Sequence, residues 1–408
     1  MKSLYIINST SRAADYGVGT YIQQVLNAVK KRQFSVNIVY LFSEEDSMVY
    51  EEDNVRFIKI TSPRVGRSSS EVISRYYRNV YYFLSPYISK QDDIVFHFNL
   101  IQGEELIRIL KQKFKCRILL TVHYMTWSFA LLGDMEHLKK IIATPESKED
   151  ERLVDSFFYE RDYINENVDH VIAIAEHSYN TLCSIYNIPD GKITLIPNGL
   201  QDCYTQLSRE ERKSVRESFS FDENEILLVF AGRIDEVKGI YALLETFNFL
   251  LAKHDKVRLV IIGDGNYERC FKASAPHWSK VVYTGFVDKS TLYQLYSIAD
   301  IGIVPSYHEE FGYVALEMMM MGLPLIVNNS TGLSELVEKD VNGAYISITS
   351  DENKVSDFSN VIEHLISDEK QRRAFVKEGR RAFKQKYELS VFKNSMLQLY
   401  DYLFSQMI

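Results

Sequence analysis

Residues 300–329, DIGIVPSYHEEFGYVALEMMMMGLPLIVNN, have the pattern of a strand, a loop, a helix and a second strand. The apolar run at 300–306 predicts a buried strand, and 312–322 carries the apolar residues of a helix after the loop YHEEF. The run LPLIVNN (323–329) predicts the second strand. A helix that connects two buried strands makes them parallel neighbours, so this stretch predicts an α/β fold built on a parallel sheet.

The same alternation of short apolar runs and amphipathic stretches extends along the chain in two series. The first series predicts strands at 4–8, 36–42, 55–60, 93–98, 117–123 and 170–175, and helices at 20–32, 104–114 and 176–186. The second series predicts strands at 225–232, 258–265, 281–285, 300–306 and 323–329. Each series is long enough for its own doubly wound domain.

The length of 408 residues is too great for one ordinary domain and favours two. We predict a Rossmann-like domain at 1–200, a second at 201–385, and a final helix at 386–408 that crosses back to the first. The polar, turn-rich segment IPNGLQDCYTQLSREER (196–212) marks the join. Two such domains facing each other across a cleft would bind ligands at the carboxyl ends of their strands.

Composition and charge match a soluble globular protein, with 46% hydrophobic and 25% charged residues. The net charge of −8 argues against a nucleic-acid binder, which carries an excess of lysine and arginine. The N-terminus, MKSLYIINSTSR, predicts a first strand and not a signal peptide, and no apolar run predicts a membrane span. The four cysteines are scattered without metal-binding spacing, which favours reduced thiols in a cytoplasmic protein.

A glycine pair, Gly17 and Gly19, stands between the first predicted strand and the first predicted helix. Glycines allow the backbone to approach a ligand closely, and a helix start offers unpaired amides to an anion. Because Ile22 occupies the sixth position of the dinucleotide fingerprint, an NAD-dependent oxidoreductase has little support. A plain tight turn explains the glycine pair equally well.

A basic pair, Arg233 and Lys238, flanks the turn in FAGRIDEVKGIYALLETF (230–247), directly after a predicted strand. Two cations at the carboxyl end of a strand suit a diphosphate, because arginine binds two oxygens at once. The alternative is a solvated charged loop, since Asp235 and Glu236 stand between the two cations.

Two glutamates, Glu309 and Glu317, bracket the start of the helix in the opening stretch. The first amides of that helix, from Gly312 to Val314, lack intrahelical partners and are suited to receive a phosphate. Glu317 would accept hydrogen bonds from two neighbouring hydroxyls, as a ribose presents them, and Glu309 would reach towards a sugar. The alternative is that both acids merely favour a helix N-terminus, which explains Glu309 better than Glu317, because apolar residues surround Glu317.

An ordered set of motifs carries a resemblance to a known family: GRIDEVKG, VIIGDG, YTGFVDKSTLYQLYSIADIGIVPS, EEFGYVALEMMMMGLPLIV, TGLSELV and NG. Residues 225–345 resemble the nucleotide-sugar domain of the retaining glycosyltransferases of family 4, which have the GT-B fold. The stretches VDHVIAIAEHSYNTL (168–182) and ITLIPNGL (193–200) resemble the end of that family's N-terminal domain. GVGTY (17–21) resembles its acceptor-side glycine loop, and the ordered set is more specific than any one motif.

The resemblance implies a role for each matching residue. Glu317 would hold the ribose hydroxyls, and Glu309 would contact the donor sugar. Arg233 and Lys238 would neutralise the departing diphosphate, and His123 would lie beside the donor sugar, with a purely structural histidine as the alternative. The remaining donor-binding residues would be Gly312, Tyr313, Val314, Gly17 and Gly19.

The chain departs from the family pattern at three positions. Tyr124 stands where the family often has aspartate, Thr20 where arginine is common, and Thr331 where a second glycine is common. These positions face the acceptor or the donor sugar in the family, so they bear on substrate identity more than on chemistry. Residues 125–166 match no motif, and we expect them to shape the acceptor site.

The resemblance implies a hexosyltransferase that moves a sugar from a nucleotide sugar to a saccharide or lipid-linked saccharide acceptor with retention of configuration. UDP- or GDP-sugars are the expected donors, no further cofactor is expected, and polysaccharide biosynthesis is the expected context. The sequence has no DxD motif in a comparable position, which agrees with a metal-independent reaction. In the family the departing phosphate is thought to deprotonate the acceptor, so Glu309 would be a positioning group and not a nucleophile.

Two other functions fit the same motifs. A nucleotide-sugar-binding protein that has lost catalysis would not hydrolyse a nucleotide sugar, and an epimerase of the same fold would need no acceptor. The intact set of Arg233, Lys238, Glu309 and Glu317 favours the transferase.

Two basic stretches raise the question of membrane contact. RILKQKFKCR (108–117) carries five cations, and PRVGRSSSEVISRYYRNVYYF (63–83) adds four arginines among tyrosines. Such patches are able to dock on anionic lipid, which would place the protein peripherally at the inner face of the membrane. The alternative is a solvated helix face that nearby acids balance.

Overall fold

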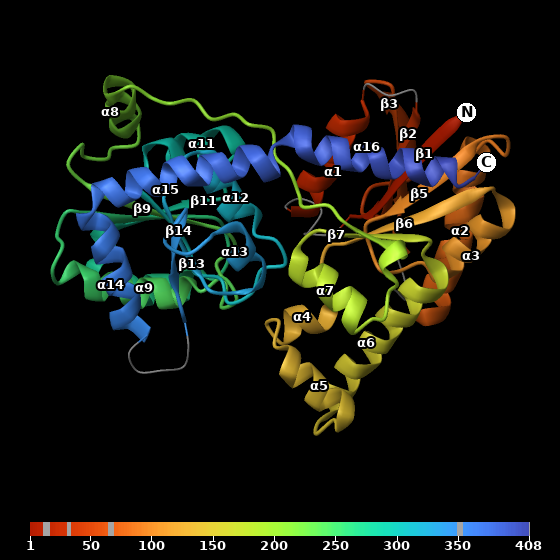
Figure 1. The fold of residues 1–408 in the computed structure, drawn as a ribbon, viewed down its shortest axis with the longest axis horizontal. Helices are drawn as coiled ribbons and strands as arrows, with labels where there is room; N and C mark the ends of the chain where they lie inside the picture. The colour runs from red at the N-terminus through yellow and green to blue at the C-terminus, as the bar shows by residue number, and fades with distance from the viewer. Residues whose placement is uncertain (11–16, 31–33, 64–68, 349–353, 408) are drawn as a thin grey trace. The chain divides into compact units, whose positions relative to one another are not determined.

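The structure is a computed structural model of the chain, and it describes residues 1–10, 17–30, 34–63, 69–348 and 354–407. The chain divides into two compact units, Met1–Gly199 together with Leu389–Ile408, and Leu200–Glu388. Each unit has a mostly parallel sheet with helices packed against it (Figure 1). This architecture confirms the predicted α/β fold class of two Rossmann-like domains.

The N-terminal unit is built on an eight-stranded sheet. Its strands are β1 (Lys2–Ser9), β2 (Phe34–Ser43), β3 (Met48–Glu52), β4 (Val55–Thr61), β5 (Asp93–Phe98), β6 (Cys116–Val122), β7 (His170–Ala173) and β8 (Ile193–Leu195). Its helices are α1 (Gly17–Val29), α2 (Ser70–Leu84), α3 (Glu104–Lys113), α4 (Thr126–Ala130), α5 (Met135–Ala143), α6 (Lys148–Asn167), α7 (Glu176–Ser184) and α16 (Leu389–Ser405). The strand order is β3-β4-β2-β1-β5-β6-β7-β8, so the winding reverses between β1 and β5.

The C-terminal unit is built on a six-stranded, wholly parallel sheet. Its strands are β9 (Ile226–Ala231), β10 (Val257–Ile262), β11 (Val281–Gly285), β12 (Ile301–Val304), β13 (Leu325–Asn328) and β14 (Gly343–Ile346). Its helices are α8 (Arg209–Ser218), α9 (Ile240–Leu251), α10 (Tyr267–Ser274), α11 (Lys289–Ile298), α12 (Tyr313–Met320), α13 (Thr331–Leu336), α14 (Lys354–Ser367) and α15 (Glu369–Ala382). The order β11-β10-β9-β12-β13-β14 is that of a doubly wound nucleotide-binding sheet, with its switch point between β9 and β12.

Burial explains which strands the sequence pattern revealed. Every residue of β12 and β13 is buried, as expected for parallel strands covered by helices on both faces. By contrast, β3 is an edge strand with mostly exposed residues, and its sequence MVYEE gave no apolar run to detect. The short edge strand β14 was also not predicted.

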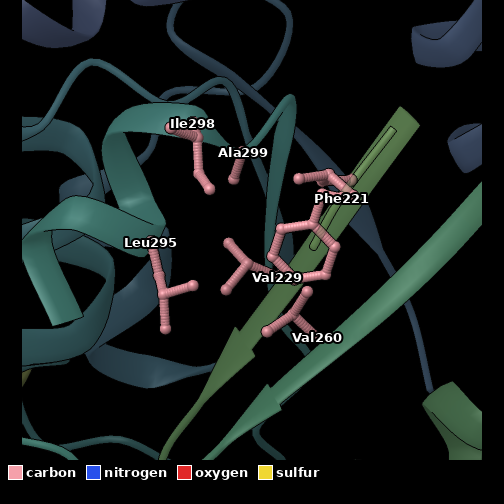
Figure 2. A pocket seen from close by; sticks show the side chains of 7 residues that line it. Phe221, Val229, Val260, Leu295, Ile298 and Ala299 are labelled. Atoms are coloured by element: carbon pink, nitrogen blue, oxygen red, sulfur yellow. The ribbon is translucent and has the colours of Figure 1, made fainter. Parts of the chain in front are cut away.

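Helix α11 packs an apolar face on the C-terminal sheet. Figure 2 shows Leu295, Ile298 and Ala299, at the end of this helix, around a gap that they share with Val229 of β9 and Val260 of β10. The space among these side chains is too small to hold a water molecule, so it is a packing contact and not a ligand pocket. This contact fixes the helix against the sheet.

Residues 125–166, which match no family motif, form the helices α4, α5 and α6 of the N-terminal unit. Helix α6 begins with a capping box, in which Ser147 and Asp150 satisfy each other's backbone amides. Within the described ranges, none of the helices combines the length and apolarity that crossing a bilayer requires.

Candidate functional site

The switch point of the C-terminal sheet brings two charged loops to one edge. The loop after β9 carries Arg233 and Lys238, and the loop after β12 carries Glu309. Because β9 and β12 are parallel neighbours, both loops leave the sheet at its carboxyl edge. Doubly wound sheets bind their ligands at this position.

The structure joins Lys238 to Glu309 directly. The Nζ atom of Lys238 lies 2.6 Å from Oε1 of Glu309, and the hydroxyl of Ser306 donates to the same oxygen at 2.9 Å. The side chains of the ion pair are only 20% and 15% exposed. Arg233 is more open, and its guanidinium lies 3.0 Å from Asp235. A phosphate bound at this edge would therefore contact two cations that are each already paired with a carboxylate.

Close backbone contacts hold the loop that carries Glu309. Gly239 has a φ of 68°, and a Cβ added there would lie 2.0 Å from the carbonyl oxygen of Pro305. The amide of Gly332 donates to the carbonyl of Glu309 at 2.8 Å, and the hydroxyl of Thr331 donates to the same carbonyl at 2.6 Å. Thr331, which stands where the family commonly has glycine, thus restrains the backbone of Glu309.

Helix α12 begins directly after this loop. Its N-cap is Gly312, with a φ of 91° that favours glycine, and a Cβ there would lie 2.8 Å from the Leu333 side chain. The amides of Gly312, Tyr313 and Val314 belong to the first turn, where a helix leaves its amides without intrahelical acceptors. Together with the helix dipole, this turn is suited to an anion.

Glu317 lies just over one turn into α12 and is only 7% exposed. Its Oε1 lies 3.3 Å from Nζ of Lys289 and accepts a hydrogen bond from the hydroxyl of Tyr293, also at 3.3 Å. Burial raises the pKa of Glu317, and the two contacts act in the opposite direction. The C-terminal unit thus combines a helix start suited to phosphate with a carboxylate suited to a diol.

In the N-terminal unit, His123 follows β6, and its Nε2 lies 2.9 Å from Oδ1 of Asn99, which follows β5. The Asn99 amide nitrogen donates to the carbonyls of Ile7 and His97, so its oxygen accepts and Nε2 of His123 carries the proton. Burial lowers the pKa of His123 to about 3. The ring is therefore neutral at pH 7, and its Nδ1 is a hydrogen-bond acceptor.

A buried network lies behind His123. Its ring meets Tyr21 edge to face at 4.7 Å, and the Tyr21 hydroxyl lies 2.8 Å from the hydroxyl of Thr121. That hydroxyl lies 2.7 Å from Nε2 of His97, whose Nδ1 lies 2.8 Å from the hydroxyl of Tyr400. The network joins β5 and β6 to α1 and α16, which run alongside each other within the N-terminal unit (Figure 1).

The glycine pair, Gly17 and Gly19, lies in the first turn of α1. Both glycines are helical in the structure, which differs from the alternative of a tight turn at these residues. The preceding part of the motif, at 11–16, lies outside the described residues.

The residues that bind the side chains of His123, Glu309 and Glu317 include several that were not singled out from the sequence: Asn99, Lys289, Tyr293 and Ser306. Asn99 and Ser306 follow strand ends, as site residues of this fold do, but small polar residues in loops are too common to select. Lys289 and Tyr293 stand four residues apart on one helix, which is a weak signal for a shared face.

Most cations of the basic stretches in the N-terminal unit pair with acids where the structure describes them. The ion pairs are Arg75–Glu71, Arg78–Glu105, Arg108–Glu105, Lys111–Asp169, Lys115–Asp93 and Arg117–Asp169. Arg64 and Arg67 lie outside the described residues. These pairs favour the solvated helix face over a lipid-binding patch.

Comparison with known proteins accounts for both units. Residues 211–382 match the family model described as glycosyl transferases group 1. Residues 16–202 match the model described as glycosyltransferase family 4. The two models adjoin in the chain and together cover most of it.

Curated relatives match over shorter stretches. An uncharacterized glycosyltransferase of Methanocaldococcus jannaschii is 36% identical over 183 residues, which are 43% of this chain and 46% of that protein. A lipopolysaccharide 1,2-N-acetylglucosaminetransferase of Salmonella typhimurium is 28% identical over 170 residues, 39% and 44% of the two chains. The alpha-monoglucosyldiacylglycerol synthase of Streptococcus pneumoniae is 30% identical over 184 residues, 44% and 41% of the two chains. The chain spans about half the length of the curated relatives it matches.

Solved structures match over the whole chain. Sucrose-phosphate synthase from Thermosynechococcus elongatus superimposes with a TM-score of 0.80 at 20% identity, and the match covers 100% of both chains. Anabaena HepE in complex with UDP gives a TM-score of 0.73 at 15% identity, covering 99% of this chain and 100% of that one. At these identities the likeness concerns the fold. The motifs of the chain, the matches to both family models and the shared fold together show that the chain belongs to the GT-B glycosyltransferases of group 1 and family 4.

Proposed function

We propose that the protein transfers a hexosyl group from a nucleotide sugar to a saccharide or lipid-linked saccharide acceptor, with retention of configuration. The observation that carries the proposal is the buried carboxylate of Glu317. It follows the first turn of α12, in the same segment as Glu309, which pairs with Lys238. A nucleoside diphosphate presents an anion and a neighbouring diol, which this combination of groups matches.

Stabilisation of the departing diphosphate would come from fixed positive groups. Arg233 and Lys238 would bind its oxygens, and the amides of Gly312, Tyr313 and Val314 would add the field of the helix N-terminus. When Lys238 shares its charge with the phosphate, its hold on Glu309 weakens. Glu309, still held by its backbone contacts, would then accept hydrogen bonds from the donor sugar.

The N-terminal unit would supply the remaining contacts. Neutral His123 would accept a hydrogen bond at Nδ1 from a sugar hydroxyl, since Asn99 occupies Nε2. The first turn of α1, with Gly17 and Gly19, would offer amides to the ligand. Residues 125–166 would shape the acceptor site.

The nature of the donor and acceptor has support from relatives. Anabaena HepE, which shares the fold, is known in complexes with UDP and with UDP-glucose, and this favours a UDP-sugar over a GDP-sugar. The names of the Salmonella and Streptococcus relatives refer to a lipopolysaccharide and a glycosyl diacylglycerol. An acceptor of the saccharide or lipid-linked class, taken from the cytoplasm or the inner membrane face, agrees with both names.

The positive groups named above would do the work that a divalent metal does in other transferases, and the departing phosphate would take the acceptor proton on the same face of the sugar. We expect turnover of the purified protein to be unchanged when EDTA replaces Mg²⁺ in the assay. Loss of turnover that Mg²⁺ restores would contradict metal independence.

The function is tested in two steps. A thermal-shift screen with UDP, GDP and ADP should identify one nucleotide that stabilises the protein, and calorimetry should show that Glu317→Ala weakens its binding by at least tenfold. The protein should then slowly hydrolyse the corresponding nucleotide sugar when no acceptor is present. A protein that binds the nucleotide sugar and leaves it intact would be a binding protein, and one that returns an altered nucleotide sugar would be an epimerase.

A further inference from the structure

Glu317 is an ionisable residue in an apolar environment. On α12 it is flanked by the buried residues Leu316 and Met318, and its side chain is 9% exposed. A carboxylate in such a site takes up a proton unless neighbouring groups stabilise its charge. If the ionised form is needed to accept two ribose hydroxyls, the groups that stabilise it are part of the binding machinery.

Helix α11 provides those groups. Lys289 and Tyr293 stand one helical turn apart, so they share a face of the helix, and both reach Oε1 of Glu317 at 3.3 Å. The end of the same helix is fixed on the sheet by the packing of Leu295 and Ile298 (Figure 2). The position of the two polar side chains is therefore set by the sheet.

The titratable groups that face Glu317 come from two elements. Lys289, Tyr293 and Tyr296 belong to α11, and Cys203 belongs to the segment before α8. Burial and then the charge of Glu317 raise the pKa of Tyr293 and of Tyr296, so both hydroxyls keep their protons. Burial raises the pKa of the Cys203 thiol, which is neutral at pH 7. Lys289 supplies the positive charge, and Tyr293 a donor that cannot ionise near pH 7.

Both contacts converge on one oxygen. Among the described residues, Lys289 and Tyr293 both contact Oε1, and no donor contacts Oε2. The carboxylate is thereby oriented, with one oxygen bound by α11 and the other left for a ligand.

We propose that Lys289 and Tyr293 are positioning residues that hold Glu317 ionised and turned with Oε2 towards the ribose of the bound nucleotide. This inference rests on the proposed function, and it adds a source of selectivity for ribonucleotides that lies on α11. This role requires no contact of either residue with the nucleotide itself.

The test compares UDP with 2′-deoxy-UDP by calorimetry on the full chain, or GDP with 2′-deoxy-GDP if the screen selects GDP. The wild type should prefer the ribonucleotide, because the deoxy form removes one of the two hydroxyls. Tyr293→Phe and Lys289→Met should each lower this preference by about tenfold. Tyr283→Phe is the matched control, since its hydroxyl binds Ser274 and the carbonyl of Cys270 in the same unit.

The pH dependence of ribonucleotide affinity gives a second readout. Affinity of the wild type for the ribonucleotide should fall as the pH is lowered through the raised pKa of Glu317. In Tyr293→Phe and Lys289→Met this fall should begin at a higher pH, whereas Tyr283→Phe should follow the wild type. Adding either substitution to Glu317→Gln should change neither quantity, because the carboxylate on which both residues act is gone.

The outcomes distinguish a failure of this inference from a failure of the proposed function. A wild type that binds no nucleotide overturns the proposed function. A wild type that binds and prefers the ribonucleotide, with both preference and pH profile unchanged in the folded α11 variants, overturns this inference alone. A weakening of UDP and 2′-deoxy-UDP alike shows structural damage and likewise rejects the positioning role.

Discussion

At the scale of single residues, Lys238 of the Lys238–Glu309 pair has two proposed roles. The short contact between the two side chains keeps the carboxylate in place while the site is empty of phosphate. On binding of a diphosphate, the same lysine would stabilise the charge that builds on the leaving group. The proposed function thus gives the pair a role that a solvated charged loop, the alternative explanation of the basic sequence, would not have.

Removal of either cation should slow the reaction strongly. We expect Lys238→Ala and Arg233→Ala to lower kcat by about 10²-fold or more, the scale seen when a charge-stabilising donor is lost. Lys253→Ala is the control, because Lys253 is half exposed and pairs with Glu363 on the surface. Near-normal kcat in both variants, measured by release of the nucleoside diphosphate, would reject the assignment of the two cations.

Two histidines of the N-terminal unit, His97 and His123, have a consequence for stability. Burial lowers the pKa of His97 and of His123 to about 3, and for His97 the nearby His123 adds to the effect. The unfolded chain binds a proton at each histidine below an ordinary value near 6.5, and the folded chain does not. Stability from these groups is thus complete above about pH 6.5 and is lost as the pH falls towards 3.

A single substitution isolates this effect. As the pH is lowered from 6 to 4, the free energy of unfolding of the wild type should fall faster than that of His97→Gln, by about 1.4 kcal/mol per pH unit. Urea denaturation at each pH provides the measurement. The exposed His137 offers a control, and His137→Gln should follow the wild type. A constant difference between the wild type and His97→Gln would show that His97 is protonated in the folded state.

At the scale of elements, the loop between β12 and α12 owes its shape to neighbouring segments. Gly239, at the start of α9, allows the Pro305 carbonyl to approach, and Gly332 and Thr331, at the start of α13, bind the carbonyl of Glu309. The starts of α9 and α13 thus both contact this loop. The position of its carboxylate therefore depends on residues of other segments that contact the loop backbone.

A methyl group at Gly239 should disturb this arrangement. Gly239→Ala combines a φ of 68° with a Cβ 2.0 Å from a carbonyl oxygen, so we expect a loss of about 2 kcal/mol or more in stability and a lower kcat. Gly191→Ala is the control, because a Cβ there meets nothing within 4 Å and stability should stay within about 0.5 kcal/mol. Denaturant unfolding and turnover of both variants provide the comparison, and equal stability of the two would contradict the close contact.

The sequence predicted those elements whose burial leaves a pattern. β9, β12 and β13 are apolar nearly throughout because helices cover both faces, and they were found. β3 was missed because an exposed edge strand needs no apolar residues. The start of α1 was placed three residues late, because glycines weaken the helix signal and the first turn carries two of them.

At the scale of the whole molecule, the candidate residues of each unit lie at the same kind of position in its sheet. In each sheet the winding reverses beside the first strand, and residues that follow the flanking strands gather at the carboxyl edge. Arg233, Lys238 and Glu309 could therefore be predicted from their places after β9 and β12. The partners of Glu317 could not, because the approach of α11 to α12 depends on packing that no local pattern records.

The central claim is that the C-terminal unit binds a nucleoside diphosphate at the switch point of its sheet. The most direct measurement is a crystal structure of the protein soaked with UDP, or with GDP if that nucleotide binds. We predict that the diphosphate lies on Arg233, Lys238 and the first turn of α12, and that both ribose hydroxyls contact Glu317. A nucleotide bound elsewhere, or a ribose turned away from Glu317, would contradict the account.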